Sequence, residues 1–333
     1  MHGSPRRAHE TGTRMVRAML FVGFGLATAG CGSSVATASA SAISAAPTVS
    51  ALPTANAVPN ATVPTASSPS GVVNNVPFTK AVDCGAAPCQ VMLDVFVPAG
   101  PGPFRTVVLL RGGPSGMGGR SYIAPFAQQL ADVGLLVFSA DYRDIFASGG
   151  GFPAAFGDIS CAVQFARTES TRYRGDGGPV TLVGHSLGAW VGSVAALDST
   201  PIKGDCLADG SGRPDSFVGL AGDYKLDAPA NQNDMIGFFG GPPATTASSR
   251  ASSDPFKYAT GSKVPVRLLA GTADTTVDPS ASTALAAFLK QKGWDVKLTL
   301  VPGATHTSLI DATADGPESV QQILEATRAA RLH

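Results

Sequence analysis

The chain has 333 residues, of which 44% are hydrophobic and only 14% charged, a composition that suits a globular protein with a large core. Basic and acidic residues each number 24, so the formal net charge is zero. Because no basic patch stands out along the chain, we expect no nucleic-acid partner.

Residues 1–31 have the pattern of an export signal. From Met15 a basic start precedes an apolar run of about a dozen residues, and small residues follow before Cys31. The run is too short to span a bilayer comfortably. Residues 28–31 resemble the lipobox of a bacterial lipoprotein signal peptide, which implies a cell-envelope lipoprotein attached to the membrane only through a lipid on Cys31. Thr28 replaces the usual leucine of that motif, so a released secreted protein is the alternative.

Residues 32–75 consist almost entirely of Ala, Ser, Thr, Pro, Val and Asn and carry no charge. Such a segment cannot bury enough apolar surface to offset the conformational entropy lost on ordering. We therefore predict a disordered linker here, followed by one folded domain over residues 76–333.

Four cysteines follow Cys31, and an even number in an exported chain favours disulfides. We predict the pairs Cys84–Cys89 and Cys161–Cys206, with a buried free thiol at Cys161 as the alternative. Because the chain has no C-x-x-C pair and no histidine cluster, we expect no metal site.

From about Val76, predicted strands and helices alternate, which is typical of an α/β fold with a mostly parallel sheet and helices on both faces. The predicted strands are 91–97, 106–110, 135–140, 180–183, 217–221, 264–270 and 296–301. The predicted helices are 123–133, 153–168, 189–197, 280–292 and 320–331.

Residues 184–188 read G-H-S-L-G, the form of a nucleophile elbow, in which a sharp turn between a strand and a helix exposes a serine hydroxyl. The five-residue pattern alone is weak, but here a buried strand precedes it and a helix follows in the required order. Ser186 is therefore the candidate nucleophile. A glycine-rich turn without chemistry is the alternative.

A serine hydroxyl needs a base to become a strong nucleophile, and elimination among the five histidines points to His306. His2 and His9 lie in the predicted export signal of residues 1–31, and His333 is the last residue. His185 is next to Ser186 on the elbow and should point away from it. His306 follows the last predicted strand, where an open α/β sheet holds its site.

The acid that orients this base should be Asp274, which follows the strand 264–270 and gives the chain order Ser, Asp, His. Asp223, after the strand 217–221, is the alternative. Asp278 is expected to cap the helix that begins near Ser280.

The oxyanion of the tetrahedral intermediate needs two N–H donors. One should be the backbone N–H of Leu187, the residue after the nucleophile, and we predict Gly113 as the second. Pro114, which follows it, has no N–H.

Together these pieces resemble the α/β-hydrolase superfamily over about 93–324, most closely small bacterial carboxylesterases near acetyl-xylan and feruloyl esterases. The resemblance implies the α/β-hydrolase fold, no cofactor, and a Ser186, His306 and Asp274 triad that cleaves a small-molecule or polymer-borne ester through an acyl-enzyme. The motifs that carry it are residues 95–113, 136–143, 184–188, 268–279 and 301–306.

One departure concerns the oxyanion loop, because Arg111 stands where these esterases usually have the histidine of His-Gly-Gly. We expect Arg111 to brace the loop, and the alternative is that it binds a substrate carboxylate. A peptidase or amidase with the same triad remains the rival enzyme, and a non-catalytic binding module the rival of another class.

Residues 223–257 are too long for a simple connection and should form a short cap or insertion near the site. Within it, residues 235–239 read M-I-G-F-F. They either line an acyl pocket or fill a small apolar cluster under a loop.

Overall fold

A computed structural model describes residues 70–85, 87–113, 119–144, 150–226, 232–259 and 262–332, without the side chains of 232–234. The predicted leader, its Cys31 and all but the last few residues of the predicted linker lie outside these ranges. Among the residues described, no helix is both long and apolar enough to cross a membrane.

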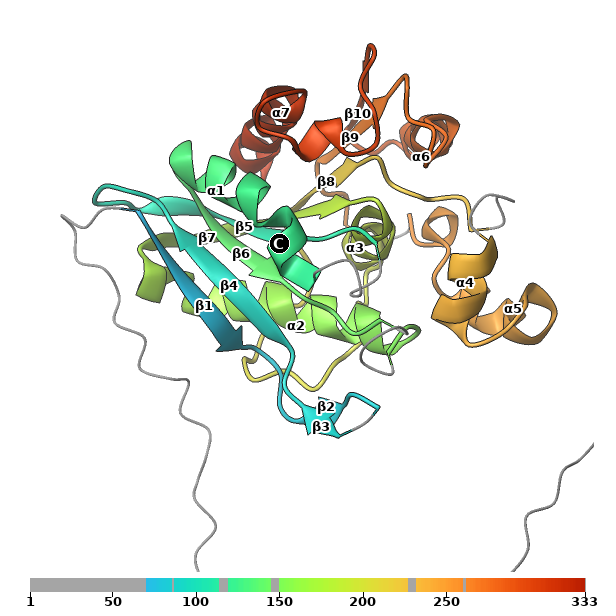
Figure 1. Cartoon of the computed structure of the whole chain (residues 1–333), viewed down its shortest axis with the longest axis horizontal. Helices are drawn as coiled ribbons and strands as arrows, with labels where there is room; N and C mark the ends of the chain where they lie inside the picture. Colours follow the sequence, from blue (N-terminus) through green and yellow to red (C-terminus); the bar gives the residue numbers. More distant parts are fainter. Residues whose placement is uncertain are drawn as a thin grey trace, which may run out of the picture. The chain divides into compact units, whose positions relative to one another are not determined.

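Eight strands form the central sheet in the order β1-β4-β6-β5-β7-β8-β9-β10, and Figure 1 shows β1 at one edge and β10 at the other. The first two pairings, β1 with β4 and β4 with β6, are antiparallel, and the others are parallel. This confirms the predicted, mostly parallel sheet. The strands are β1 (Gly71–Pro77), β4 (Met92–Val97), β5 (Phe104–Leu110), β6 (Leu135–Ala140), β7 (Gly175–His185), β8 (Ser216–Leu220), β9 (Val266–Gly271) and β10 (Val296–Val301).

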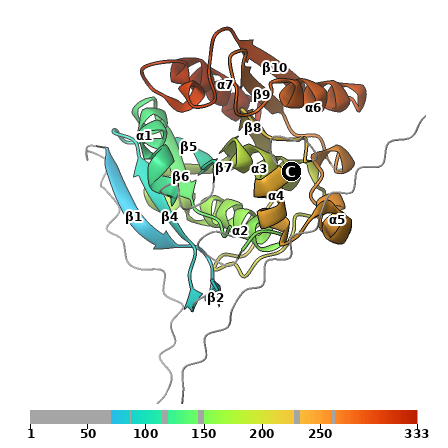
Figure 2. The same cartoon turned by 45° about the vertical axis from the view of Figure 1, so that its right-hand side comes forward.

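Helices cover both faces of the sheet, and Figure 2 shows the two layers on opposite sides of it. Alternate side chains of β5 pack into different layers: Val107 and Leu109 with α1 and α7, Val108 and Leu110 with α2, α3 and α6. Successive residues of the buried stretches are therefore mostly apolar, as in residues 107–110 of β5, which is expected of strands buried on both faces. The helices are α1 (Ala124–Asp132), α2 (Ala154–Glu169), α3 (Leu187–Leu197), α4 (Gln232–Phe239), α5 (Pro243–Ala251), α6 (Ser280–Gln291) and α7 (Gly316–Ala329).

The first strand among the described residues begins at Gly71, so the linker prediction is wrong for residues 71–75. Val72 pairs with Phe96 and Val73 with Val95 on β4, which turns a segment of small residues into an edge strand. Composition did not reveal this strand, because its ordering depends on backbone pairing with β4 and on packing of Val73 and Val76 against the core. Elsewhere the predicted elements are present with shifted ends: β7 begins five residues earlier than predicted, and α7 four.

Both predicted disulfides are present. Cys84–Cys89 links the short paired strands β2 (Val82–Asp83) and β3 (Pro88–Cys89). Cys161–Cys206 ties α2 to the segment that leads into β8.

Among its described residues, the predicted insertion contains α4, α5 and the 3-10 turn η5 (Pro255–Lys257). Met235 and Phe238 are buried in the same core cluster as α2 and α3, and the Phe238 ring lies 4.9 Å from the Trp190 ring, centroid to centroid. These two side chains therefore fill a core and do not line an open acyl pocket. Ile236, on the other side of α4, is exposed.

Candidate active site

Ser186 occupies a strained turn between β7 and α3, with φ 54° and ψ −121°. A non-glycine residue rarely adopts a positive φ, and such conformations persist only where the surroundings impose them. Here the Ser186 N–H donates to the carbonyl of Leu220 on β8 at 2.8 Å. A side chain on Gly184 would collide with the backbone of Gly188 across the turn, and one on Gly188 would collide with the backbone of Leu110 and Arg111 at the end of β5. Both glycines are therefore sterically required.

His306 and Asp274 form a hydrogen-bonded pair. Nδ1 of His306 donates to Oδ2 of Asp274 at 2.9 Å, and Oδ1 of Asp274 accepts the N–H groups of Thr276 and Val277 at 2.8 and 2.9 Å. Burial would raise the pKa of this carboxyl, but the three hydrogen bonds outweigh it and hold the pKa below its ordinary value. The pair therefore presents an ionised carboxylate to the ring and leaves Nε2 of His306 as the proton acceptor.

Asp278 and Asp223, the other two acids considered for this role, do not form the hydrogen bond to His306. Asp278 accepts the N–H of Ser280 at 2.7 Å, as expected for a residue that caps α6. Asp223 is buried just after β8, and it is Asp274 that accepts the hydrogen bond from Nδ1 of His306.

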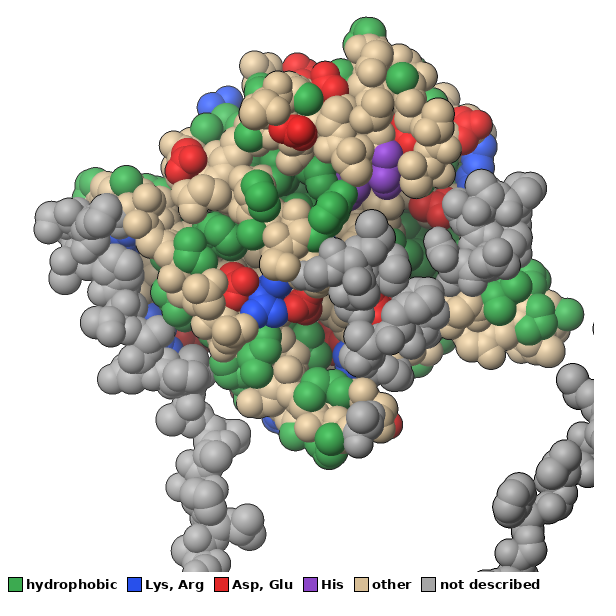
Figure 3. Space-filling view, in the orientation of Figure 1, with side chains coloured by type: hydrophobic (Ala, Val, Ile, Leu, Met, Phe, Trp, Pro, Cys, Tyr) green, Lys and Arg blue, Asp and Glu red, His purple; other side chains and the backbone are tan. Residues whose placement is uncertain are grey.

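Ser186, Asp274 and His306 follow β7, β9 and β10, and the carboxyl ends of these parallel strands meet at one edge of the sheet. A direct contact ties the elbow to the loop of the base: Nε2 of His185 is 2.9 Å from the carbonyl oxygen of His306. His306 is only partly buried. On the face shown in Figure 3, histidine side-chain atoms reach the surface.

The predicted oxyanion loop lies against the elbow. A Cβ on Gly112 would be 2.7 Å from Cβ of Ser186 and 2.8 Å from Nδ1 of His185, so only glycine fits there. Gly113 has a positive φ of 62°, which also suits glycine. Leu187, the other predicted donor, is the first residue of α3, where backbone N–H groups have no partner within the helix.

Arg111 is 1% exposed, and its guanidinium is held within the protein. Nη1 donates to the carbonyl of Gly113 at 2.6 Å, Nη2 to Oδ2 of Asp144 at 3.0 Å, and Nε to Oδ1 of Asp141 at 3.2 Å. The Tyr142 ring lies 4.4 Å from the guanidinium carbon. Of the two interpretations of Arg111, these contacts favour the brace of the oxyanion loop over a contact with a substrate carboxylate.

Sequence reasoning missed two features of the site. The first is the set of groups that accept hydrogen bonds from Arg111. The sequence D-Y-R-D at 141–144, directly after a buried strand, could have indicated them. The second is the contact of His185 with His306. No local pattern signals it, because the two residues are 121 positions apart.

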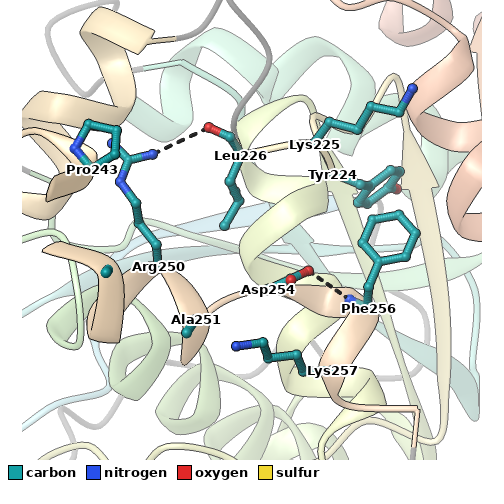
Figure 4. A pocket seen from close by; sticks show the side chains of 10 residues that line it. Tyr224, Lys225, Leu226, Pro243, Arg250, Ala251, Asp254, Phe256 and Lys257 are labelled. Atoms are coloured by element: carbon teal, nitrogen blue, oxygen red, sulfur yellow. Dashed lines mark hydrogen bonds between the residues drawn. The ribbon is translucent and has the colours of Figure 1, made fainter.

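A cleft of about 660 Å³ lies within the predicted insertion, between residues 224–226 and residues 243–257 (Figure 4). None of Ser186, Asp274 and His306 lines it. Tyr224, Leu226 and Phe256 give it apolar walls, and Nη1 of Arg250 donates to the carbonyl of Leu226 at 3.3 Å. The charged residues that line it are Lys225, Arg250, Lys257 and Asp254. Cations therefore outnumber acids in this cleft.

No group of three or more His, Cys, Asp or Glu side chains that could hold a metal ion occurs among the described residues. The chemistry available at this edge is that of a serine hydroxyl, an imidazole–carboxylate pair and backbone N–H donors. Such groups serve acyl transfer.

Comparison with known proteins gives three findings. Residues 93–289 match the model of the BD-FAE family. The probable isoprenylcysteine alpha-carbonyl methylesterase of Oryza sativa subsp. japonica is 27% identical over 230 residues, which cover 65% of this chain and 55% of that protein. The chain spans about half the length of the curated relatives it matches.

Among solved structures, a truncated carbohydrate esterase from gut microbiota aligns with a TM-score of 0.66 at 16% identity, over 80% of this chain and 99% of that one. The propionate-bound thermophilic esterase of Thermogutta terrifontis aligns with a TM-score of 0.60 at 16% identity, over 75% of this chain and 92% of that one. At these identities the likeness shows a common fold.

Proposed function

Because the chain belongs to the BD-FAE family, an esterase type of α/β-hydrolase, we propose that it is a serine hydrolase that cleaves carboxylic esters through an acyl-enzyme intermediate. The single observation that carries this proposal is the His306–Asp274 hydrogen bond at the same sheet edge as the strained Ser186. A strained serine and an oriented imidazole have no evident use in a binding module, whereas ester cleavage needs both.

In the proposed reaction, Oγ of Ser186 attacks the acyl carbon while Nε2 of His306 takes its proton. Asp274 stabilises the resulting imidazolium. The backbone N–H groups of Leu187 and Gly113 stabilise the oxyanion, and each such donor is typically worth about 3 kcal/mol of the barrier. His306 then gives the proton to the leaving alcohol, and a water molecule activated by the same ring hydrolyses the acyl-enzyme.

Arg111 takes no part in the proton transfers. Its hydrogen bond to the carbonyl of Gly113 fixes the peptide plane next to the one whose N–H is the proposed oxyanion donor. Because the guanidinium is itself held by Asp141 and Asp144, the loop is positioned before substrate binds. Such preorganisation is what makes an oxyanion hole effective.

The comparisons support ester over peptide cleavage. The matching family is an esterase type of α/β-hydrolase, and the curated relatives that the chain matches are named as methylesterases. We therefore propose a small-molecule or polymer-borne ester as the substrate class.

We also propose that the protein acts outside the cytoplasm, attached to the cell envelope through Cys31, or released if that residue is not lipidated. The support is the export-signal pattern of residues 1–31 together with the two disulfides, which persist in oxidising compartments. Metabolic labelling with an alkynyl fatty acid tests the lipid: a Cys31→Ala variant should lose it.

The decisive experiment is labelling with a serine-directed fluorophosphonate, in parallel with hydrolysis of a short-chain nitrophenyl ester. The wild-type chain should be labelled and should turn over the ester, and Ser186→Ala should lose both activities. Ser193→Ala is the matched control, since Ser193 lies buried on α3, the helix that follows Ser186, and donates to the carbonyl of Trp190. Labelling that persists in the Ser186→Ala protein would refute the assignment, and a wild-type chain that shows neither activity would favour a binding module.

A further inference from the structure

The proposed reaction gives no role to His185, although this imidazole lies at the centre of the site. Its side chain is buried, with 1% of the residue exposed. It lies between Gly112 of the oxyanion loop and the loop that carries His306. A buried polar ring that bridges two functional loops calls for a physical explanation.

The chemistry of the contact fixes the tautomer of His185. Because a carbonyl oxygen can only accept, Nε2 of His185 must carry the proton that it donates to the carbonyl of His306. Burial and the neighbouring His306 lower the pKa of His185 to about 4. The ring is therefore neutral near pH 7, with Nδ1 unprotonated and facing Gly112.

His306 is thus held at two points. Nδ1 of its ring is bound to Asp274 at 2.9 Å, and its main-chain carbonyl is bound to His185 at 2.9 Å. With only one of these two bonds, either the ring or the main chain of His306 would not be held, and the direction of the imidazole could change. Together they fix the direction of Nε2, the atom that must face the hydroxyl of Ser186.

The rest of the loop is tied to the neighbouring strand by hydrogen bonds that do not involve His306. The N–H of Gly303 donates to Oγ1 of Thr272 at 2.8 Å, and the N–H of Ala273 donates to the carbonyl of Ala304 at 3.0 Å. These bonds hold the start of the loop against β9. The bond from His185 instead ties the base to the elbow, and so to the nucleophile.

We propose that His185 is a positioning residue, which holds the main chain of His306 so that the imidazole meets Ser186 in a reactive geometry. This inference rests on the proposed function, because it assigns a role within the same site. The competing explanation is that the ring only fills space in the core.

Three substitutions separate these explanations. His185→Gln keeps an N–H donor at nearly the same reach. His185→Met fills a similar volume without a donor. His185→Asn stays polar but is too short to reach the carbonyl of His306, and it replaces His185→Met if that variant does not fold. Ser193→Ala again serves as the control, because it loses a buried hydrogen bond that is not connected to His306.

The first readout is kcat for a nitrophenyl ester, expressed per active site as titrated with a fluorophosphonate. We expect His185→Met to lower kcat about 10- to 100-fold, since misplacing a catalytic group by about 1 Å has effects of this size. KM should change less than about 3-fold, and His185→Gln should restore kcat to within about 3-fold of the wild type. Wild-type kcat in His185→Met, or equal losses in the Gln and Met variants, would overturn the positioning role.

The second readout does not depend on ester turnover. The proton between Nδ1 of His306 and Asp274 should give a downfield NMR resonance, assigned by its absence in His306→Gln. We expect this resonance to be kept in His185→Gln and to shift or broaden in His185→Met. An unchanged resonance in His185→Met would overturn the inference even if the proposed function failed, whereas a wild-type chain that neither hydrolyses esters nor reacts at Ser186 would refute the proposed function alone.

Discussion

The carboxyl edge of the sheet and the insertion of α4, α5 and η5 are neighbours held in different ways. At the edge, directional hydrogen bonds of 2.6 to 3.2 Å fix Arg111, Asp274 and His306. The insertion is held mainly by aromatic packing, such as Phe238 on Trp190, with a bond from Nε1 of Trp190 to the carbonyl of Ser253 at 2.9 Å.

The difference has a physical consequence. A hydrogen bond specifies an angle, so the loss of one partner misplaces the other. Apolar packing is non-directional and tolerates a change of shape if the volume is roughly kept. We therefore expect substitutions at the edge to change the chemical step, and substitutions in the insertion to change stability and ester preference modestly.

The largest effect should come from the carboxylate of the proposed triad. Asp274→Asn removes the negative charge that orients and stabilises the His306 imidazolium. We expect kcat to fall by about 10⁴ with little change in far-UV circular dichroism. Asp278→Asn, which alters only the exposed helix cap, should keep kcat within about 2-fold. Similar losses in both variants would mean that the edge is not organised around Asp274.

The next effect concerns stability. Arg111→Met takes the guanidinium away from Asp144, a carboxylate with 1% of its side chain exposed. Breaking a buried ion pair in this way should lower the free energy of unfolding by about 3–5 kcal/mol in urea titrations. Lys297→Met breaks the exposed pair with Glu325 and should cost about 1 kcal/mol or less. Equal costs would contradict the brace assigned to Arg111.

Gly112→Ala should lower kcat about 100-fold, because the added methyl group would lie 2.7 Å from Cβ of Ser186 and 2.8 Å from Nδ1 of His185. The fluorophosphonate labelling rate of Ser186 measures the same displacement. Gly71→Ala on β1 is the matched control, since a Cβ there has no neighbour within 4 Å among the described residues. A wild-type labelling rate in the Gly112→Ala protein would show that the elbow accommodates the added methyl group without displacing Ser186.

The buried His185 predicts a pH dependence of stability. Its pKa is about 4 in the folded chain, and the ordinary value is 6.5. The unfolded chain therefore binds a proton that the folded chain does not, and stability falls as pH drops from about 6.5 toward 4. The loss should reach about 3 kcal/mol at pH 4.

His185→Gln should remove this part of the pH dependence, which urea titrations at pH 7, 5.5 and 4 would measure. The lowered pKa of Asp274 acts in another window: its contribution is present above its ordinary pKa of 3.8 and is lost as pH falls through the lower folded value. A curve with the same slope between pH 6.5 and 4 in both proteins would contradict the burial of a neutral His185.

The smallest effect should come from the insertion. Phe238→Leu trims a ring packed on Trp190 and should cost about 1–2 kcal/mol of unfolding free energy. We expect kcat for nitrophenyl acetate and the ratio of butyrate to acetate hydrolysis both to stay within about 3-fold, because Phe238 packs in the core. A loss of kcat as large as that of Gly112→Ala would erase the distinction between the two regions.

Much of the architecture could be predicted from the sequence. The strands around Val107 and Leu182 are largely apolar on successive positions because they are buried on both faces, and that local property is typical of a parallel sheet. The elbow could be predicted for a similar reason, since Gly184 is needed because a side chain there would collide with Gly188 across the turn. The need for Gly188 is not local, because a side chain there would collide with Leu110 and Arg111. The edge strand from Gly71 could not, because its order depends on pairing with a distant strand.

The amino-acid sequence by itself determined the order of the elements, the elbow and the small number of candidate acids and bases. These depend on local pattern and on which residue types are present. Only the tertiary structure decided that Asp274 rather than Asp223 binds His306, that Arg111 holds the carbonyl of Gly113, and that His185 reaches the loop of the base. The physical reason is that a hydrogen bond depends on distance and angle to a few tenths of an ångström. Residues far apart in sequence acquire that precision only when the strands that carry them are packed side by side.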